Sequence, residues 1–264
     1  MNRIESRFRE LRASGGKAFI PFVTAGDPDL ESTHAIVLAM EEAGADVVEL
    51  GVPFSDPIAD GPVIQRATER SLEAGTTLDG ILETVRRIRA SSQIPLLLFS
   101  YYNPLLSRGL GRLAGELAEA GIDGVLASDL TVEESGPFVE TMRPKGLSTV
   151  FLVAPTSSPE RIGRIVGAST GFVYAVSRTG VTGAGDELSG ELTGFIRRLR
   201  TSTDSPIAVG FGISTPQHVR AVWREADGAA VGSAIVREIE AHAGRPDLAA
   251  SVGRFVRWLR EGQA

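Results

Sequence analysis

The stretch Asp46-Val-Val-Glu-Leu-Gly-Val-Pro-Phe-Ser-Asp-Pro-Ile-Ala-Asp-Gly-Pro62 holds the strongest indication of how this chain folds. A short apolar, β-prone run ends at a carboxylate, Glu49, and passes directly into a loop rich in glycine and proline. The loop carries Asp56 and Asp60 and leads into a helical pattern near residues 63–74. This pattern predicts a strand, a long loop and a helix, with Glu49 either reaching a cleft or pairing with a neighbouring arginine.

The same alternation of strand and helix recurs along the chain. Helical spacing of apolar residues is clear in Leu78–Ile88, Leu110–Ala120 and Leu192–Leu199. The predicted strands are Ala18–Val23, Val47–Leu50, Pro95–Tyr101, Gly124–Ala127, Thr149–Val153, Gly171–Val176, Pro206–Val209 and Gly228–Val231.

Eight strand–helix units predict the α/β class, with right-handed crossovers and a parallel sheet. They fit a single (β/α)₈ TIM barrel over residues 1–264, with an extra helix at Ile4–Ala13 covering its bottom. The alternative is an open doubly wound sheet. The absence of a glycine-rich dinucleotide loop after the first strand disfavours that alternative.

Composition excludes several classes of function. The net charge of −6 argues against a nucleic-acid partner, which would require a basic patch. No apolar run is long enough to span a membrane, and the first 16 residues read as a charged amphipathic helix rather than a signal peptide. Cysteine is absent, which removes disulfides, thiolate metal sites and a cysteine nucleophile. We therefore expect a cytoplasmic protein.

In a barrel, function lies in the loops that follow the strands. The loops at Val52–Pro62 and Ser177–Leu188 are long and contain glycine, so they are predicted to act as lids, the alternative being tolerated insertions. The last two strands end in Gly210-Phe-Gly-Ile-Ser214 and Val231-Gly-Ser-Ala-Ile235, each leading into a helix start. Small residues and free helix N–H groups favour a phosphorylated substrate there, with Gly183 as a third wall.

Few residues remain for other chemistry. The lysines, Lys17 and Lys145, precede strands and should lie at the bottom, away from a Schiff-base role. The histidines are predicted on outer helices or near the C-terminus, so no metal site is expected; they are His34, His218 and His242. Acid–base catalysis by carboxylates remains, with Glu49 as the candidate, and its apolar neighbours should raise its pKa.

Several segments of the chain resemble the tryptophan synthase alpha subunit. The similarity is carried by Glu49–Pro62, whose sequence is highly specific, and by five further segments in the same order along nearly the whole chain. These segments are Pro21-Phe-Val-Thr-Ala-Gly-Asp-Pro28, Tyr101-Tyr-Asn-Pro104, Phe151-Leu-Val-Ala-Pro-Thr156, Ser177-Arg-Thr-Gly-Val-Thr-Gly183 and Gly210-Phe-Gly-Ile-Ser214.

The resemblance implies a retro-aldol lyase that cleaves indole-3-glycerol phosphate to indole and glyceraldehyde 3-phosphate. It implies that Glu49 moves protons, that Asp60 faces the indole N–H, and that Tyr174 supports them. It further implies phosphate binding at Gly183, Gly212, Gly232 and Ser233, indole walls at Phe22, Ile64, Leu126 and Phe211, and lid residues Arg178 and Thr182. Plain barrel packing is the alternative for the four wall residues.

The resemblance also implies a beta subunit that receives indole in an α2β2 complex. Pyridoxal phosphate is expected only in that subunit, and no cofactor is expected in this chain. Contacts are predicted at Pro53, Asp56, Pro57 and Asn103, which could otherwise be ordinary surface. The chain departs from the family pattern at Ser128 and at Thr131, where proline is usual. A stand-alone lyase, a catalytically silent regulatory subunit, and a different sugar-phosphate isomerase or aldolase remain as alternatives.

Overall fold

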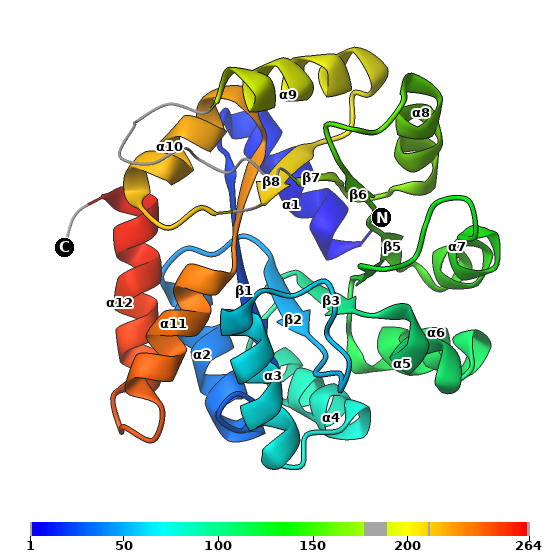
Figure 1. Ribbon diagram of the computed structural model, residues 1–264. Coiled ribbons are helices and arrows are strands. Elements are labelled where there is room, and N and C mark those ends of the chain that lie inside the picture. The colour runs from blue at the N-terminus through cyan, green and yellow to red at the C-terminus, as the bar shows by residue number, and fades with distance from the viewer. Residues whose placement is uncertain (1, 177–188, 211, 263–264) are drawn as a thin grey trace.

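The computed structural model describes residues 2–176, 189–210 and 212–262 (Figure 1). Within these residues, nine parallel strands lie in the order β5-β4-β3-β2-β1-β9-β8-β7-β6, which confirms the predicted parallel sheet. The strands are β1 (Ala18–Thr24), β2 (Val48–Gly51), β3 (Leu96–Ser100), β4 (Gly124–Ala127), β5 (Ser148–Thr149), β6 (Leu152–Val153), β7 (Val173–Val176), β8 (Ile207–Gly210) and β9 (Gly228–Val231).

The single fifth strand predicted over Thr149–Val153 is divided into β5 and β6, so that prediction was wrong in its continuity. The Val150 N–H donates to the Val125 carbonyl of β4 at 3.0 Å, and the Phe151 carbonyl accepts from the Tyr174 N–H of β7 at 3.2 Å. The segment therefore joins the two ends of the sheet and closes the barrel. Barrel strands are tilted and staggered. The N-terminal part of this segment therefore pairs with β4, and its C-terminal part pairs with β7.

Helices surround the barrel (Figure 1). Several begin at a residue whose side chain accepts a backbone N–H of the first turn, as Asp29, Thr77 and Thr215 do. The helices are α1 (Arg3–Ser14), α2 (Leu30–Glu42), α3 (Pro62–Glu73), α4 (Leu78–Arg89), α5 (Tyr102–Ser107), α6 (Leu110–Ala120), α7 (Gly136–Met142), the 3-10 turn η1 (Arg143–Lys145), α8 (Pro159–Ala168), α9 (Gly190–Ser202), α10 (Pro216–Glu225), α11 (Ser233–His242) and α12 (Leu248–Glu261). Among the described helices, none combines the length and apolar character needed to cross a membrane.

The core has an inner and an outer layer. Side chains alternate along a strand, so Val48 and Leu50 of β2 pack in the outer layer of apolar residues, while Val47 belongs to the inner one. The inner layer is closed at the N-terminal ends of the strands by α1, whose Phe8 ring lies 5.3 Å from the Phe172 ring. The barrel interior is thus filled at its bottom, and open space is left at the other end of the strands.

Three pairs of neighbouring strands, and β5 with β7 where the barrel closes, begin with the same hydrogen-bonded arrangement. A polar residue before the second strand donates its backbone N–H to a carbonyl near the start of the first strand. Its side-chain oxygen accepts the N–H of that same residue, with distances of 2.7–2.9 Å. The pairs are Asp46 with Phe19, Asp123 with Leu96, Thr170 with Thr149 and Asp227 with Ile207. These contacts fix the register of adjacent strands, and therefore the relative positions of their far ends.

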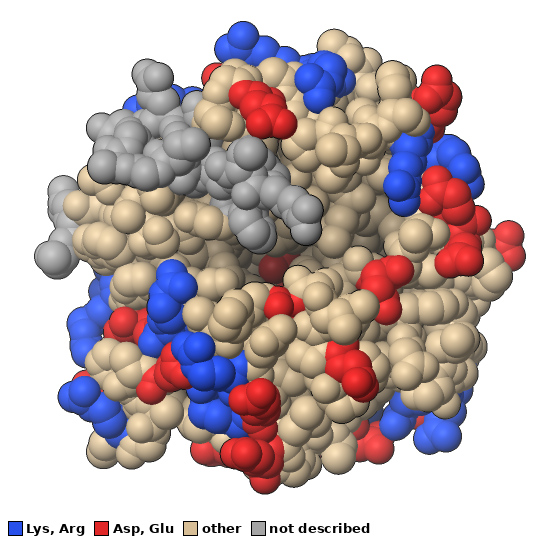
Figure 2. Space-filling view, viewed as in Figure 1, with Lys and Arg blue, Asp and Glu red and all other residues tan. Residues whose placement is uncertain are grey.

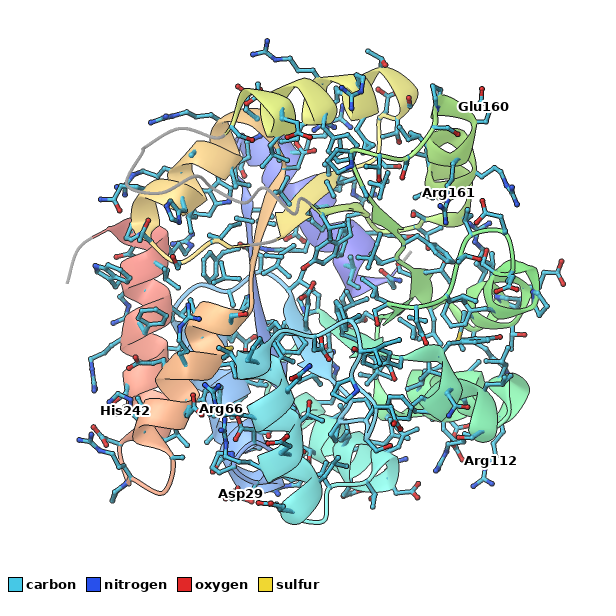
Figure 3. All side chains as sticks on the ribbon, in the orientation of Figure 1. Asp29, Arg66, Arg112, Glu160, Arg161 and His242 are labelled. Carbon is cyan, nitrogen blue, oxygen red and sulfur yellow. The ribbon has the colours of Figure 1, made fainter. Side chains whose placement is uncertain are left out.

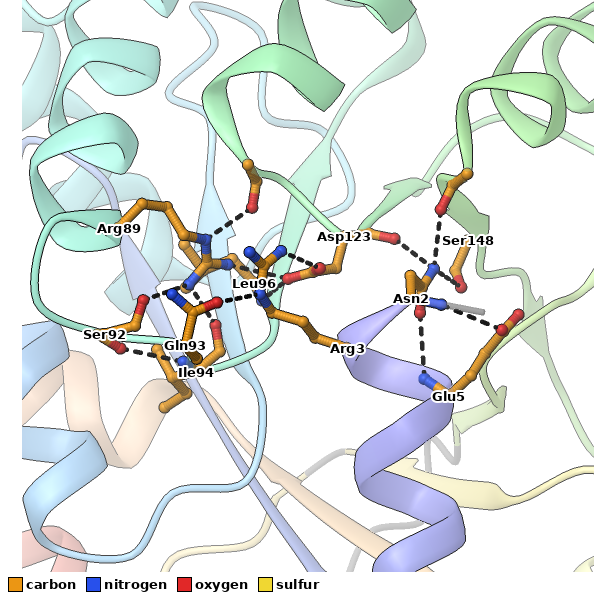
Figure 4. Close-up of polar contacts among 12 residues, drawn as sticks. Asn2, Arg3, Glu5, Arg89, Ser92, Gln93, Ile94, Leu96, Asp123 and Ser148 are labelled. Atoms are coloured by element: carbon orange, nitrogen blue, oxygen red, sulfur yellow. Dashed lines mark hydrogen bonds and ion pairs between the residues drawn. The ribbon is translucent and has the colours of Figure 1, made fainter.

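Asp123 is the centre of the largest of these arrangements (Figure 4). Its carboxylate accepts from Arg3, Arg89 and the Leu96 N–H, each at 2.9 Å, and the Arg89 side chain is only 10% exposed. We expect Asp123→Ala to lower the free energy of unfolding by about 3 kcal/mol or more, because the buried Arg89 cation loses its carboxylate partner and the Leu96 N–H loses its side-chain acceptor. Urea unfolding measures the loss.

The matched control is Glu83→Ala, which removes an exposed carboxylate that pairs with Arg86. Exposed pairs of this kind contribute roughly 0–1 kcal/mol. Equal midpoints for the two variants would contradict the role assigned to Asp123.

Candidate active site at the carboxyl ends of the strands

A cavity of about 630 Å³ opens at the carboxyl ends of the strands. Figure 2 shows a hollow near the middle of the visible face, with acidic atoms within it. Its lining includes eight residues predicted for the site, namely Phe22, Glu49, Asp60, Ile64, Tyr174, Gly212, Gly232 and Ser233. Segments far apart in the sequence therefore converge on one space.

Glu49 lies on the inner side of β2, two residues after Val47 and between the outward-packed Val48 and Leu50. It is 1% exposed and lines the cavity, and its Oε1 atom has no hydrogen-bond partner among the described residues. Burial raises the pKa of Glu49 to about 8, against the opposing effect of a hydrogen bond with Tyr174. The group can therefore gain or lose a proton near neutral pH.

Tyr174, on β7, brings its hydroxyl to the Glu49 carboxyl group. Burial raises the pKa of Tyr174, and the nearby Glu49 raises it further, so the hydroxyl keeps its proton. Gly210 makes room for the ring, because a Cβ atom there would lie 2.4 Å from the Tyr174 oxygen. Gly210 therefore allows Tyr174 to reach the Glu49 carboxyl group, and it also begins the loop that follows β8.

Asp60 enters the same cavity from the loop between β2 and α3. The Tyr101 hydroxyl donates to Asp60 Oδ2 at 3.0 Å and accepts the Ala59 N–H at 2.9 Å. Burial raises the pKa of Asp60, and the hydrogen bond from Tyr101 opposes that shift. Sequence reasoning did not give Tyr101 a place in the site, although it stands directly after β3 in a segment already noted for its similarity.

The glycine-bearing ends of β8 and β9 form another wall. Gly212 has a φ of 70°, a left-handed conformation that favours glycine. Gly232 precedes α11 and offers no capping side chain, so the first N–H groups of that helix, beginning at Ser233, have no cap from the N-cap residue. The arrangement suits an anion.

Only some of the residues predicted to contact indole line the cavity. Phe22 and Ile64 line the cavity, whereas Leu126 is fully buried in the inner core and does not reach the lining. Phe99 lines the cavity instead and meets Phe22 edge-on, with ring centres 5.6 Å apart. The predicted residues Arg178, Thr182, Gly183 and Phe211 lie outside the described residues.

The four residues predicted to contact a partner differ in how exposed they are. Pro53 is buried, Pro57 is half-buried, and Asp56 and Asn103 are exposed. The β2–α3 loop packs against Tyr101, whose ring centre lies 5.4 Å from that of Phe54, so the two segments share one surface. Only the exposed members of the predicted set can meet a partner directly.

Lysine and histidine lie away from the cavity, as predicted. Lys17 pairs with Asp227 before β9 at 3.7 Å, and Lys145 lies in η1 ahead of β5. His242 ends α11 on the outside of the molecule (Figure 3). His34 and His218 lie in α2 and α10, and neither lines the cavity. Within the described ranges, no three His, Cys, Asp or Glu residues are grouped closely enough to hold a metal ion.

The raised pKa of Glu49 has a consequence for stability. Because its value is about 8 in the folded chain against an ordinary 4.5, the folded state holds a proton that the unfolded state has released between these limits. The contribution of this proton is complete below about pH 4.5 and is lost as pH rises through about 8. We therefore expect the free energy of unfolding of the wild type to fall relative to Glu49→Gln across this window, with a slope approaching ~1.4 kcal/mol per pH unit. Urea unfolding of both proteins at several pH values measures it, and a constant difference would contradict it.

A closed parallel barrel with a buried carboxyl–tyrosine pair and glycine-lined strand ends at its mouth defines an enzyme of the (β/α)₈ class. The chain belongs to the tryptophan synthase alpha chain family, whose sequence model matches residues 8–257.

Named relatives agree with this assignment. The chain is 51% identical to the tryptophan synthase alpha chain of Solibacter usitatus over 262 residues, covering 99% of this chain and 98% of the relative. The tryptophan synthase subunit alpha of Legionella pneumophila superposes with a TM-score of 0.91 at 36% identity, covering all of both chains. A chain of the tryptophan synthase α2β2 complex of Pyrococcus furiosus superposes with a TM-score of 0.87 at 38% identity, covering 93% of this chain and 98% of that one.

Proposed function

We propose that this site cleaves indole-3-glycerol phosphate to indole and glyceraldehyde 3-phosphate, and that Glu49 moves the protons. The chain is accordingly a carbon–carbon lyase of tryptophan biosynthesis, the alpha subunit of tryptophan synthase. The observation that carries the proposal is the buried carboxyl group of Glu49 on the cavity wall, where Oε1 has no hydrogen-bond partner among the described residues and the pKa is raised to about 8. Such a group can act as both acid and base in one reaction cycle.

Glu49 donates one proton and accepts one proton in each reaction cycle. Its protonated form gives a proton to indole C3, which places positive charge on the ring nitrogen. The resulting carboxylate takes the proton of the glycerol hydroxyl next to the ring. The carbon–carbon bond then breaks, its electron pair returns to the ring, and an aldehyde forms. Tyr174 orients the carboxyl group through their hydrogen bond.

Asp60 stabilises the positive charge that develops on the ring nitrogen. Its carboxylate lies in the cavity and is held by Tyr101 at 3.0 Å, so it is positioned before the charge appears. Preorganised charge of this kind acts most strongly away from water. Phe22, Ile64 and Phe99 supply an apolar wall for the ring, and the ends of β8 and β9 receive the phosphate on backbone N–H groups.

The chain also works with a beta subunit, as in the α2β2 complex that the Pyrococcus furiosus relative forms. Asp56 and Asn103 are the proposed contacts, and Ile58, two residues after Asp56 in the same loop, is 87% exposed. Pyridoxal phosphate belongs to the beta subunit, and the lysis itself needs only side chains of this chain. Residues 1–264 act as one cytoplasmic barrel domain.

The rate of indole release from indole-3-glycerol phosphate tests the proposal, measured with the chain alone and with a beta subunit. Slow release that rises sharply with the beta subunit is the expected result. Rapid release that ignores the beta subunit would indicate a stand-alone lyase, and Thr131 would be the first position to restore to proline. No release under either condition would overturn the catalytic assignment and leave a silent regulatory subunit.

A further inference from the structure

The charges on the cavity wall are unfavourable for a phosphorylated substrate. The acidic side chains of Asp60 and Glu191 line the cavity, and a phosphate group brings further negative charge into it. Among the described lining residues, the one basic side chain is Arg237. Backbone N–H groups alone supply only partial positive charge, so a full cation on this wall would matter for binding.

Arg237 is placed so that it can reach the phosphate end of the cavity. It stands four residues after Ser233, the first residue of α11, and residues at this spacing share one helix face. Helical side chains tilt toward the N-terminus, which directs the guanidinium back toward Ser233. Ile235 and Val236 turn into the core, whereas Arg237 is exposed and lines the cavity together with Ser233.

The guanidinium of Arg237 is not committed elsewhere in the described part of the chain, where it makes neither an ion pair nor a hydrogen bond. Other arginines near α11 differ. Arg66, on α3 (Figure 3), and Arg70 both pair with Glu240 of α11, at 2.8 and 2.9 Å. Arg237 has no such carboxylate partner within the described ranges and lines the cavity, so it remains available for an anionic ligand.

We propose that Arg237 is a phosphate-binding residue of this site. Its guanidinium donates charge-assisted hydrogen bonds to the phosphate oxygens, which complement the backbone N–H groups of Gly212, Gly232 and Ser233. The assignment rests on the proposed function and adds a basic side chain to a site that the sequence predicted from glycines and helix starts alone. Binding energy from the phosphate is present before and during the reaction, so Arg237 acts on KM and leaves kcat nearly unchanged.

The test compares Arg237→Gln with Arg245→Gln, which removes the same charge from an arginine that pairs with Asp247 and does not line the cavity. Calorimetry with glycerol 3-phosphate gives the Kd, and indole release gives KM and kcat. We expect Arg237→Gln to raise both the Kd and KM by about tenfold or more, and Arg245→Gln by less than about twofold. Arg237→Lys should recover part of the loss, and the salt dependence of KM should weaken in Arg237→Gln.

The failures of the two proposals are distinguishable. If the wild type binds glycerol 3-phosphate but releases no indole, the lysis is overturned and the binding role of Arg237 is still measured. If Arg237→Gln binds glycerol 3-phosphate as Arg245→Gln does while the wild type releases indole, the role of Arg237 is overturned alone. A wild type that neither binds glycerol 3-phosphate nor releases indole would overturn both.

Discussion

Replacing Glu49 with glutamine is expected to lower kcat for indole release by about 10²- to 10⁴-fold, the usual contribution of a positioned acid–base group. Glutamine keeps the shape of the protonated side chain and can still bond to Tyr174, but it can neither donate the proton to indole C3 nor accept one from the glycerol hydroxyl. The loss should therefore fall on kcat, with KM changed little. Single-turnover measurement of indole formation separates this step from product release.

Glu191→Gln is the matched control, because Glu191 is another glutamate on the wall of the same cavity but is exposed. It should change kcat by no more than a few-fold. Folding is not expected to suffer in Glu49→Gln, since Oε1 of the native side chain has no partner among the described residues to lose. A Glu49→Gln enzyme with more than a tenth of the wild-type kcat would rule out Glu49 as the proton carrier.

The second large effect is expected at Asp60. Asp60→Asn should lower kcat by about 10²-fold, because an amide in the same position cannot offset the positive charge on the ring nitrogen. Tyr101 can still donate to the amide oxygen, so the loop should keep its conformation. Indole release by stopped-flow absorbance gives the rate, and thermal unfolding checks that the fold is unchanged.

Tyr101→Phe is the companion variant to Asp60→Asn. It keeps the carboxylate but removes the hydroxyl that holds it and that accepts the Ala59 N–H. We expect a smaller loss than in Asp60→Asn, since the charge is retained and only its positioning is loosened. If Tyr101→Phe costs as much as Asp60→Asn, or if Asp60→Asn leaves kcat within a few-fold of the wild type, charge stabilisation is not the function of Asp60.

Much of the barrel is readable from local pattern. The predicted range Gly124–Ala127 matches β4 in full, and Leu110–Ala120 matches α6, because apolar spacing and glycine punctuation are properties of short segments. The exception is the fifth strand. Its division into β5 and β6 depends on where β4 and β7 lie beside it, which no local signal records.

The sequence by itself indicated which end of the barrel holds the site and gave Glu49 as the candidate carboxylate. Both follow from the order of strand and loop in Asp46–Pro62, where a strand ends at a carboxylate and a long loop follows. Only the tertiary structure decided that Leu126 stays in the core while Phe99 reaches the cavity, that Tyr101 holds Asp60, and that Arg237 lines the same cavity. The reason is physical. A wall built from several strands and helices depends on their tilt, register and docking, and these are set by contacts between segments far apart in the chain.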